Sequence, residues 1–244
     1  MACGTIGGVR IEGIAAAVPK ARVRNADFEL LSPVDRARMI KATGIEERRV
    51  AAENVCASDL CAAAAQKLLV ELGWVAAEVD AVIFVSQTPD YRLPATSVVL
   101  QDRLGLPKST LALDINLGCS GYVYGLSTAS SMVSAMKLRK ALLLVGDLAT
   151  RTNSQRDRTS GPLFGDAGTA TALTRDSGAP SLYFSLSSDG SGKDAIIVPG
   201  GGYRHPLRPE DVEVREVAEG VFRSAEHAIL DGGAIFNFTL REVP

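Results

Sequence analysis

An α/β fold built around a parallel sheet is predicted by three features of the 244-residue sequence. Five segments between residues 81 and 146 alternate strictly between strand-like and helix-like patterns. The strand-like runs 81–86, 110–115 and 141–146 are almost continuously apolar, as expected for parallel strands covered on both faces. Hydrophobic residues make up 46% of the chain, which is enough for one large domain or two smaller ones.

The residues before this alternating region predict a strand and then a helix. The segment 9–15 alternates between apolar and polar residues, which is typical of a strand. Asn25 belongs to the residue types that cap helix N-termini. We therefore expect a helix from Ala26 to about Lys41 that continues through Pro33 and is broken at Thr43-Gly44.

Three more helices are predicted in the middle of the chain. Ser58-Asp59 opens the helix 60–74, and Gly73 lies at its C-terminal end. The helices 94–104 and 120–136 connect the apolar strands. Small residues surround the whole circumference of helix 120–136, so neighbouring elements can approach it from every side. We therefore expect this helix to be buried in the middle of a layered structure.

The last third of the chain is predicted to be less regular. A tight turn at Gly165 leads into a strand, and a hairpin or loop follows at 188–194. The segment 199–211 is the part of the chain richest in proline and glycine, which indicates a loop or linker. Residues 217–230 are weakly helical, and Asn237 lies in a final strand-like run.

The charge pattern argues against a polyanionic partner. The chain carries 26 basic and 28 acidic residues, a net charge of -2, without a block of like charge. Neither a nucleic-acid footprint nor a membrane-binding stripe is therefore expected. No apolar run approaches the roughly 18 residues of a membrane span, and the N-terminus lacks the apolar core of a signal peptide. We expect a cytoplasmic protein.

The cysteine and histidine pattern does not predict a metal site. The four cysteines form no C-x-x-C pair, and Cys56 and Cys61 lie five residues apart on a helix, a spacing that aligns two ligands poorly. His205 and His227 are the only histidines. We therefore expect no zinc site, and reduced thiols in a reducing compartment.

The segment DINLGCSG, residues 114–121, places Cys119 where a strand pattern gives way to a helix pattern. Backbone N–H groups and the helix dipole at such a position favour a thiolate over a thiol. Gly118 and Gly121 allow a sharp turn and leave room for a substrate carbonyl, whose oxyanion the local N–H groups can hold. Capture of an acyl group as a thioester is one interpretation. A small cysteine chosen for packing is the other, and the position alone leaves both open.

An ordered set of motifs makes the chain similar to a known family. The set comprises Thr43–Arg49, Leu93–Thr96, Asp114–Gly121, Asp157-Arg158, Phe164–Asp166 and Ser188–Gly190. In this order the motifs resemble those of β-ketoacyl-acyl-carrier-protein synthase III and its relatives in the thiolase superfamily, over residues 6–244. The resemblance implies a thiolase-like fold, with a first half at residues 1–175 and, at 176–244, the strands and loop between the halves and the beginning of the second.

The resemblance also implies a reaction and residues that carry it. The family's cysteine takes an acyl group from acyl-CoA or an acyl carrier protein, and the acyl-enzyme condenses with a malonyl thioester with loss of carbon dioxide. Cys119 matches that nucleophile, and its N–H matches part of the oxyanion hole. Arg158 matches an arginine that contacts the coenzyme A nucleotide. Leu93 matches a residue that enters the acyl pocket of a neighbouring subunit, which implies a homodimer. Coenzyme A thioesters are substrates, and no permanently bound cofactor is implied.

Three departures from the family pattern qualify this expectation. Ala42 stands where many members carry an arginine for coenzyme A, and the tryptophan expected near residues 38–40 is absent. The glycine-rich turn after Phe164 is partly replaced. The family's catalytic histidine and asparagine lie in the second half, of which the sequence to Pro244 contains only the beginning. We therefore expect these 244 residues to be unable to complete the condensation alone.

Other functions remain open from the sequence. His205 lies in a glycine- and proline-rich loop and His227 precedes the second half, so neither is expected to replace the family's histidine. An acyltransferase that passes the acyl group from Cys119 to an amine or hydroxyl is a second hypothesis. A non-catalytic partner subunit that keeps the fold and the dimer surface is a third.

Overall fold

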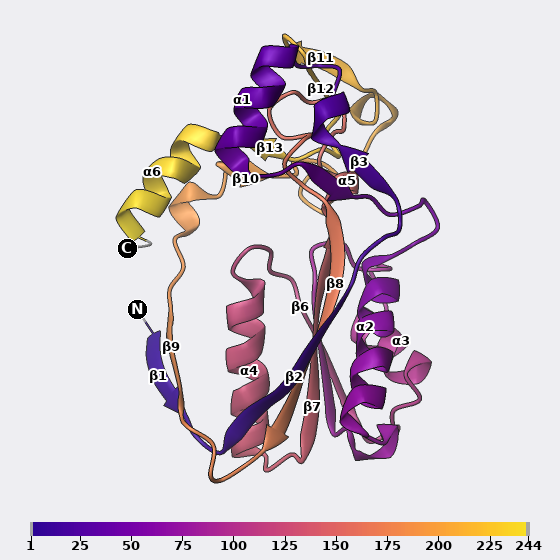
Figure 1. Ribbon diagram of the computed structural model, residues 1–244, viewed down its shortest axis with the longest axis vertical. Helices are drawn as coiled ribbons and strands as arrows, with labels where there is room; N and C mark the ends of the chain where they lie inside the picture. Colours follow the sequence, from indigo (N-terminus) through magenta and orange to yellow (C-terminus); the bar gives the residue numbers. More distant parts are fainter. Residues whose placement is uncertain (1, 243–244) are drawn as a thin grey trace. The chain divides into compact units, whose positions relative to one another are not determined.

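A computed structural model describes residues 2–242 of the chain, which form two compact units (Figure 1). Unit 1 comprises the chain as far as Ala21, Ala51–Leu148 and Asp166–Ser187. Unit 2 comprises Arg22–Val50, Ala149–Gly165 and the chain from Ser188 onward. Each unit is discontinuous in sequence. The predicted boundary between two family halves near residue 175 is a different division, and it stays a prediction.

A five-stranded sheet forms the centre of unit 1, in the order β2-β8-β7-β5-β6. Its strands are β2 (Val9–Ala17), β5 (Ala81–Val85), β6 (Leu111–Ile115), β7 (Lys140–Leu148) and β8 (Asp166–Arg175). β5 pairs in parallel with β6 and β7, while β8 runs antiparallel to β7 and β2. The predicted α/β class and parallel strands are confirmed. β5 is buried along its whole length, whereas β6 is partly exposed, so coverage of both faces was wrong for β6.

Helices cover both faces of this sheet (Figure 1). α2 (Ala57–Leu72) and α3 (Thr96–Arg103) lie on one face, and α4 (Gly121–Ala135) lies on the other. A short 3₁₀ helix, η2 (Ala76–Glu78), follows α2. Alternate residues of β5 serve the two cores: Phe84 packs on the side of α2 and α3, and Ile83 on the side of α4. Gly73 ends α2 in the left-handed conformation, as predicted.

Helix α4 lies between the central sheet and a two-stranded ribbon. A Cβ atom on Gly125 would lie 2.8 Å from side-chain atoms of Val85 and Leu143, so the absence of a side chain lets α4 approach the sheet. An antiparallel ribbon of β1 (Ala2–Ile6) and β9 (Leu182–Leu186) lies beyond α4 (Figure 1). Val123 is nevertheless 49% exposed. The central helix expected after the nucleophile therefore lies between the sheet and this ribbon, with part of its surface exposed.

Unit 2 consists of short elements. They are β3 (Arg22–Arg24), η1 (Asn25–Asp27), α1 (Pro33–Thr43), β4 (Glu47–Arg49), α5 (Ala149–Thr152), η3 (Gly190–Gly192), β10 (Ile196–Ile197), η4 (Pro209–Asp211), β11 (Arg215–Ala218), β12 (Val221–Arg223), β13 (Ile229–Leu230) and α6 (Gly232–Glu242). Three antiparallel pairs join β3 with β4, β10 with β13, and β11 with β12.

Helix α1 begins eight residues after the predicted cap. Ser32 is its cap and accepts the N–H of Asp35 at 3.1 Å, and Pro33 occupies the first turn. Proline fits there because the first N–H groups of a helix have no partner inside the helix. Asn25 is instead buried, and its side-chain amide donates to the carbonyls of Ile45 and Pro162. The prediction of a continuous helix through Pro33 was wrong, whereas its end at Gly44 is confirmed.

Two predictions near the C-terminal end were also wrong. Residues 217–230 contain the hairpin of β11 and β12 instead of a helix, and Gly220 turns it with φ of +67°. Asn237 lies in helix α6 instead of a strand. Asp231 caps this helix by accepting the N–H of Ala234 at 2.9 Å. Val243 and Pro244, the end of the predicted strand-like run, lie outside the described residues.

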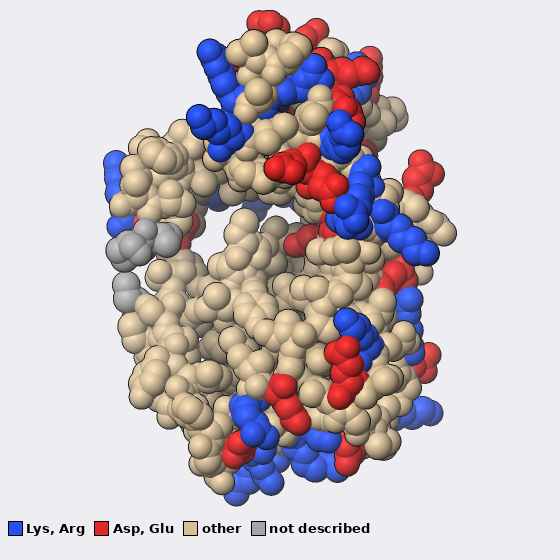
Figure 2. Space-filling model, in the orientation of Figure 1, with Lys and Arg blue, Asp and Glu red and all other residues tan. Residues whose placement is uncertain are grey.

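The surface carries both signs of charge. Figure 2 shows lysines and arginines beside aspartates and glutamates on the displayed face, in keeping with the net charge of -2. Among residues 2–242, no helix has the length and apolar character required to cross a membrane.

Candidate active site

Cys119 lies in the tight turn that joins β6 to α4. β6 ends at Ile115, and α4 begins at Gly121. The N–H of Gly121 donates to the carbonyl of Gly118 at 2.8 Å and closes the turn around the cysteine. The Cys119 side chain is exposed. The strand-to-helix turn predicted from the sequence is therefore present, and it presents the thiol at the surface of unit 1.

The two glycines of this turn lie close to neighbouring side chains. Neither Gly118 nor Gly121 adopts the left-handed conformation. A Cβ atom on Gly121 would lie 2.7 Å from Val85 in the central strand, and one on Gly118 would collide with the side chain of Gln87. These glycines let the turn sit directly on the end of the sheet.

Two backbone donors beside the thiol are available to a substrate. The N–H groups of Cys119 and Ser120 donate to no acceptor among the described residues. Both residues are exposed, and they directly precede α4, whose N-terminal end carries partial positive charge. A sulfur nucleophile next to unpaired N–H groups is suited to attack a carbonyl and to hold the resulting oxyanion.

Asp114, for which the sequence alone indicates no separate role, fixes helix α3 beside this turn. Its two carboxylate oxygens accept the N–H groups of Thr96 and Ser97 at 2.7 and 2.8 Å. Because β6 carries both Asp114 and the turn of Cys119, this carboxylate sets the start of α3 relative to the nucleophile. A charged residue inside an otherwise apolar strand was the available signal.

Asp147 has a similar role at the end of β7 and was also missed. Its Oδ1 accepts the N–H of Gln87 at 2.7 Å, the N–H of Thr88 at 3.1 Å and the hydroxyl of Ser86 at 3.0 Å. These contacts order the chain where it leaves β5. These hydrogen bonds cannot be predicted from a local sequence pattern, because Asp147 and its partners are about 60 residues apart in sequence.

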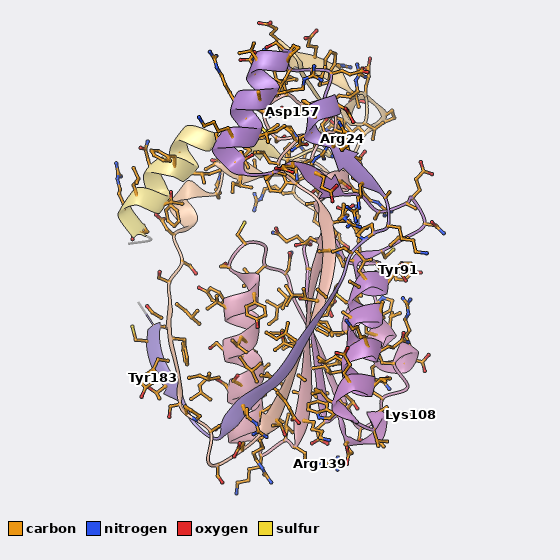
Figure 3. The ribbon with its side chains drawn as sticks, in the orientation of Figure 1. Arg24, Tyr91, Lys108, Arg139, Asp157 and Tyr183 are labelled. Atoms are coloured by element: carbon orange, nitrogen blue, oxygen red, sulfur yellow. The ribbon has the colours of Figure 1, made fainter. Side chains whose placement is uncertain are left out.

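Leu93 lies in the connection between β5 and α3. Its side chain is 80% exposed in this chain, and Tyr91, labelled in Figure 3, is exposed in the same loop. Ser58 of α2 donates to the Asp90 carboxylate at 2.8 Å and ties the loop to the helix. The loop is thus held to α2 at Asp90 and exposes the apolar side chain of Leu93. Its role in an acyl pocket stays a prediction.

Arg158 belongs to unit 2 and is held by the β11–β12 hairpin. Its N–H donates to the carbonyl of Gly220 at 3.0 Å, and its guanidinium lies 3.7 Å from the carboxylate of Glu219. The preceding Asp157, labelled in Figure 3, is buried and paired with Arg223 at 2.5 Å. Burial raises the pKa of Asp157, but hydrogen bonds from Thr159 and the pairing with Arg223 outweigh this and lower it.

Each of the two histidines contacts a polar side chain or backbone group of a nearby residue. His205 is half-exposed and lies 3.3 Å from the carboxylate of Asp211. His227 accepts the N–H of Ser224 at 3.0 Å, and partial burial lowers the pKa of His227. That neither histidine replaces the family's catalytic histidine stays a prediction.

The remaining cysteines differ from Cys119 in their surroundings. Cys61 is fully buried on α2, and burial raises the pKa of its thiol to about 12. Cys3 is exposed on β1, where its Sγ lies 3.6 Å from the hydroxyl of Ser185. Within residues 2–242, no three Cys, His, Asp or Glu side chains are grouped to hold a metal ion.

A family model, several curated proteins and several solved structures are similar to this chain. The family model described as 3-oxoacyl-[acyl-carrier-protein (ACP)] synthase III matches residues 113–190, which include Cys119 and Arg158. Beta-ketoacyl-[acyl-carrier-protein] synthase III of Roseiflexus castenholzii is 36% identical, over 96% of this chain and 68% of the relative. Its counterpart from Syntrophomonas wolfei is 32% identical with the same coverage. The crystal structure of 3-oxoacyl-(acyl-carrier protein) synthase from Burkholderia xenovorans is similar with a TM-score of 0.91 and 43% identity, covering 100% of this chain and 68% of that one.

Proposed function

The chain belongs to the 3-oxoacyl-(acyl-carrier-protein) synthase III family of transferases, and from this premise we propose that Cys119 carries the acyl group in a ketoacyl synthase reaction. The acyl donor is acyl-CoA or an acyl carrier protein, and the extender is a malonyl thioester. The enzyme needs no bound cofactor for these steps.

The proposed reaction has two stages. In the first, the Cys119 sulfur attacks the thioester carbonyl, a new carbon–sulfur bond forms, and the donor's thiol leaves with a proton. In the second, which we propose for the intact enzyme that also contains the family's second half, the malonyl thioester loses carbon dioxide, and the resulting enolate carbon forms a carbon–carbon bond with the acyl carbonyl. The Cys119 sulfur leaves as the thiolate, which restores the enzyme.

The observation that carries this proposal is the environment of Cys119. Its exposed thiol stands beside two N–H groups that have no acceptor within residues 2–242, in the turn that the family model covers. A cysteine retained only for packing would be expected to be buried, as Cys61 is. Four cysteines without disulfides support a cytoplasmic location.

The acyl-enzyme can be tested directly by mass spectrometry. The purified protein is incubated with acyl-CoA donors of increasing chain length, and the mass of the whole chain is measured. We expect a mass increase equal to one acyl group, which peptide mapping assigns to Cys119. Cys119→Ala should abolish the adduct, whereas Cys3→Ala, which removes another exposed thiol, should retain it. Absence of an adduct from every donor, or an adduct at Cys3 instead, would contradict the proposal.

The second stage needs a separate assay. Acyl-enzyme loaded on Cys119, in a form of the protein that also contains the family's second half, is mixed with malonyl-acyl-carrier-protein, and release of carbon dioxide is measured together with loss of the adduct. Stoichiometric release of both supports condensation. Discharge of the adduct by an amine or alcohol, with no response to the malonyl thioester, would contradict it.

We further propose that Arg158 binds the nucleotide part of coenzyme A. Among the described residues, its guanidinium pairs only with the exposed carboxylate of Glu219, at 3.7 Å, and a phosphate is a stronger partner for arginine. Arg158→Ala should raise KM for acyl-CoA about tenfold, but leave KM unchanged for an acyl thioester of N-acetylcysteamine, which lacks the nucleotide. Equal effects on both donors would contradict this role.

We also propose a homodimer in which Leu93 enters the partner's acyl pocket. An 80% exposed leucine on an anchored loop supports this proposal, because burying such a side chain contributes about 2 kcal/mol. Light scattering should give twice the mass of the chain. Leu93→Ala should change the preferred acyl chain length, and an unchanged preference would contradict the role of Leu93.

A further inference from the structure

Gln87 occupies an unusual position relative to the turn of Cys119. Its backbone leaves β5 and is held by Asp147, whose Oδ1 accepts the Gln87 N–H at 2.7 Å. The same oxygen accepts the N–H of Thr88 and the hydroxyls of Ser86 and Thr88. Several hydrogen bonds to one carboxylate oxygen fix the backbone from which the Gln87 side chain projects.

The Gln87 carboxamide lies against Gly118, directly before the nucleophile. A Cβ atom on residue 118 would collide with the Oε1 atom of Gln87 and lie 3.1 Å from its Cδ atom. Since Gly118 is not in the left-handed conformation, its lack of a side chain provides this space for Gln87. Consecutive Cα atoms lie about 3.8 Å apart, so the carboxamide is a near neighbour of Cys119.

The carboxamide has hydrogen-bonding capacity that the protein does not use. A glutamine side chain offers two N–H donors and a carbonyl acceptor. Gln87 is exposed, and within residues 2–242 its side chain makes no hydrogen bond. The structure thus holds an unpaired polar group beside the thiol, on a backbone that is itself anchored.

We propose that Gln87 is a specificity-determining residue, which hydrogen-bonds an oxygen atom near the thioester of the acyl group on Cys119. This inference rests on the proposed acyl-enzyme. An unsubstituted alkyl chain that passes the Gln87 carboxamide displaces the water bound to it and offers no hydrogen bond in return. Acyl groups without an oxygen at this place are therefore disfavoured. A hydroxyl or carbonyl oxygen on the third carbon replaces those bonds. The preferred acyl groups are therefore oxygenated near the thioester, and Asp147 is the residue that positions Gln87.

A matched pair of donors tests this preference. Rates of Cys119 acylation are measured with 3-hydroxybutanoyl-CoA and butanoyl-CoA, which differ by one hydroxyl group. In the unaltered protein and in Gln87→Leu, the quantity compared is the ratio of kcat/KM between the two donors. We expect this ratio to fall about tenfold in Gln87→Leu, because leucine keeps the bulk of the side chain and removes its hydrogen bonds. Gln66→Leu, an exposed glutamine on α2 across the sheet, is the control and should keep the original ratio.

The outcomes separate this inference from the proposed function. A ratio that is unchanged in Gln87→Leu, while Cys119 is still acylated, would overturn the inference alone. The same fall in Gln66→Leu would also overturn it, because the effect would then be independent of position. Absence of any adduct in the unaltered protein would overturn the proposed function and, with it, this inference.

Discussion

Cys61 lies on one face of the central sheet and Cys119 lies in the turn at the end of β6, and both lie beside glycines. At Cys61, Gly146 and Gly168 allow helix α2 to lie directly on strands β7 and β8, and the thiol is sealed in the core. At Cys119, Gly118 and Gly121 allow a turn to lie on the end of the sheet, and the thiol faces solvent. Glycine context alone therefore does not predict a reactive cysteine. The element that the glycines bring close decides whether the thiol is buried or presented.

The largest expected difference between the two thiols is in their rates of alkylation. With iodoacetamide at neutral pH, Cys119 should react at least about 10³-fold faster than Cys61, because Cys61 reacts only when the core opens. Peptide mapping at a series of times gives both rates. In denaturant the two rates should converge. If Cys61 reacted at a rate comparable to that of Cys119 in the native protein, its burial in the core would be contradicted.

Gly168→Ala tests the close approach at the buried cysteine. The new Cβ would lie 2.5 Å from the backbone nitrogen of Cys61 and 2.7 Å from the carbonyl carbon of Leu60, so helix α2 must move. We expect the free energy of unfolding to fall by about 3 kcal/mol, measured by urea denaturation. Gly7→Ala is the control, since its nearest neighbour is 3.6 Å away, and should change stability by less than about 0.5 kcal/mol.

Alkaline pH should weaken the fold through Cys61. Because burial raises the pKa of Cys61 from 9.0 to about 12, the folded state keeps a proton that the unfolded chain releases above pH 9. The contribution to stability is complete below pH 9 and is lost as the pH rises towards 12. At pH 10 the loss should be about 1 kcal/mol.

The control for this pH effect is Cys61→Ala. Its stability should fall less between pH 8 and pH 10 than that of the unaltered protein, as measured by urea denaturation at each pH. Identical pH dependence in the two proteins would mean that Cys61 does not titrate as its burial requires.

Gly118→Ala should lower stability less than Gly168→Ala does. The atoms that its Cβ meets belong to the flexible end of Gln87, which can move aside, so we expect a cost below about 1 kcal/mol. Displacement of the carboxamide should lower the preference for 3-hydroxybutanoyl-CoA, as Gln87→Leu does. A stability loss as large as that of Gly168→Ala would show that the two glycine contacts are equivalent.

Several predictions made from the sequence were wrong for identifiable reasons. Asn25 has a residue type suited to a helix cap. Its side-chain amide instead donates hydrogen bonds to the carbonyls of Ile45 and Pro162, which are distant in sequence. Residues 217–230 have weak helical character, but the turn at Gly220 and strand pairing prevail. In both places a tertiary contact outweighed a weak local preference.

The alternation of strands and helices, the ends of helices at Gly44 and Gly73, and the turn that carries Cys119 can all be predicted from the order of residues. These features depend on apolar periodicity and on the backbone chemistry of neighbouring residues. The contacts by which Asp147 anchors Gln87 and Gln87 lies over Gly118 cannot be predicted in this way. Those contacts join strand ends that are distant along the chain, and folding of the sheet is what brings them together.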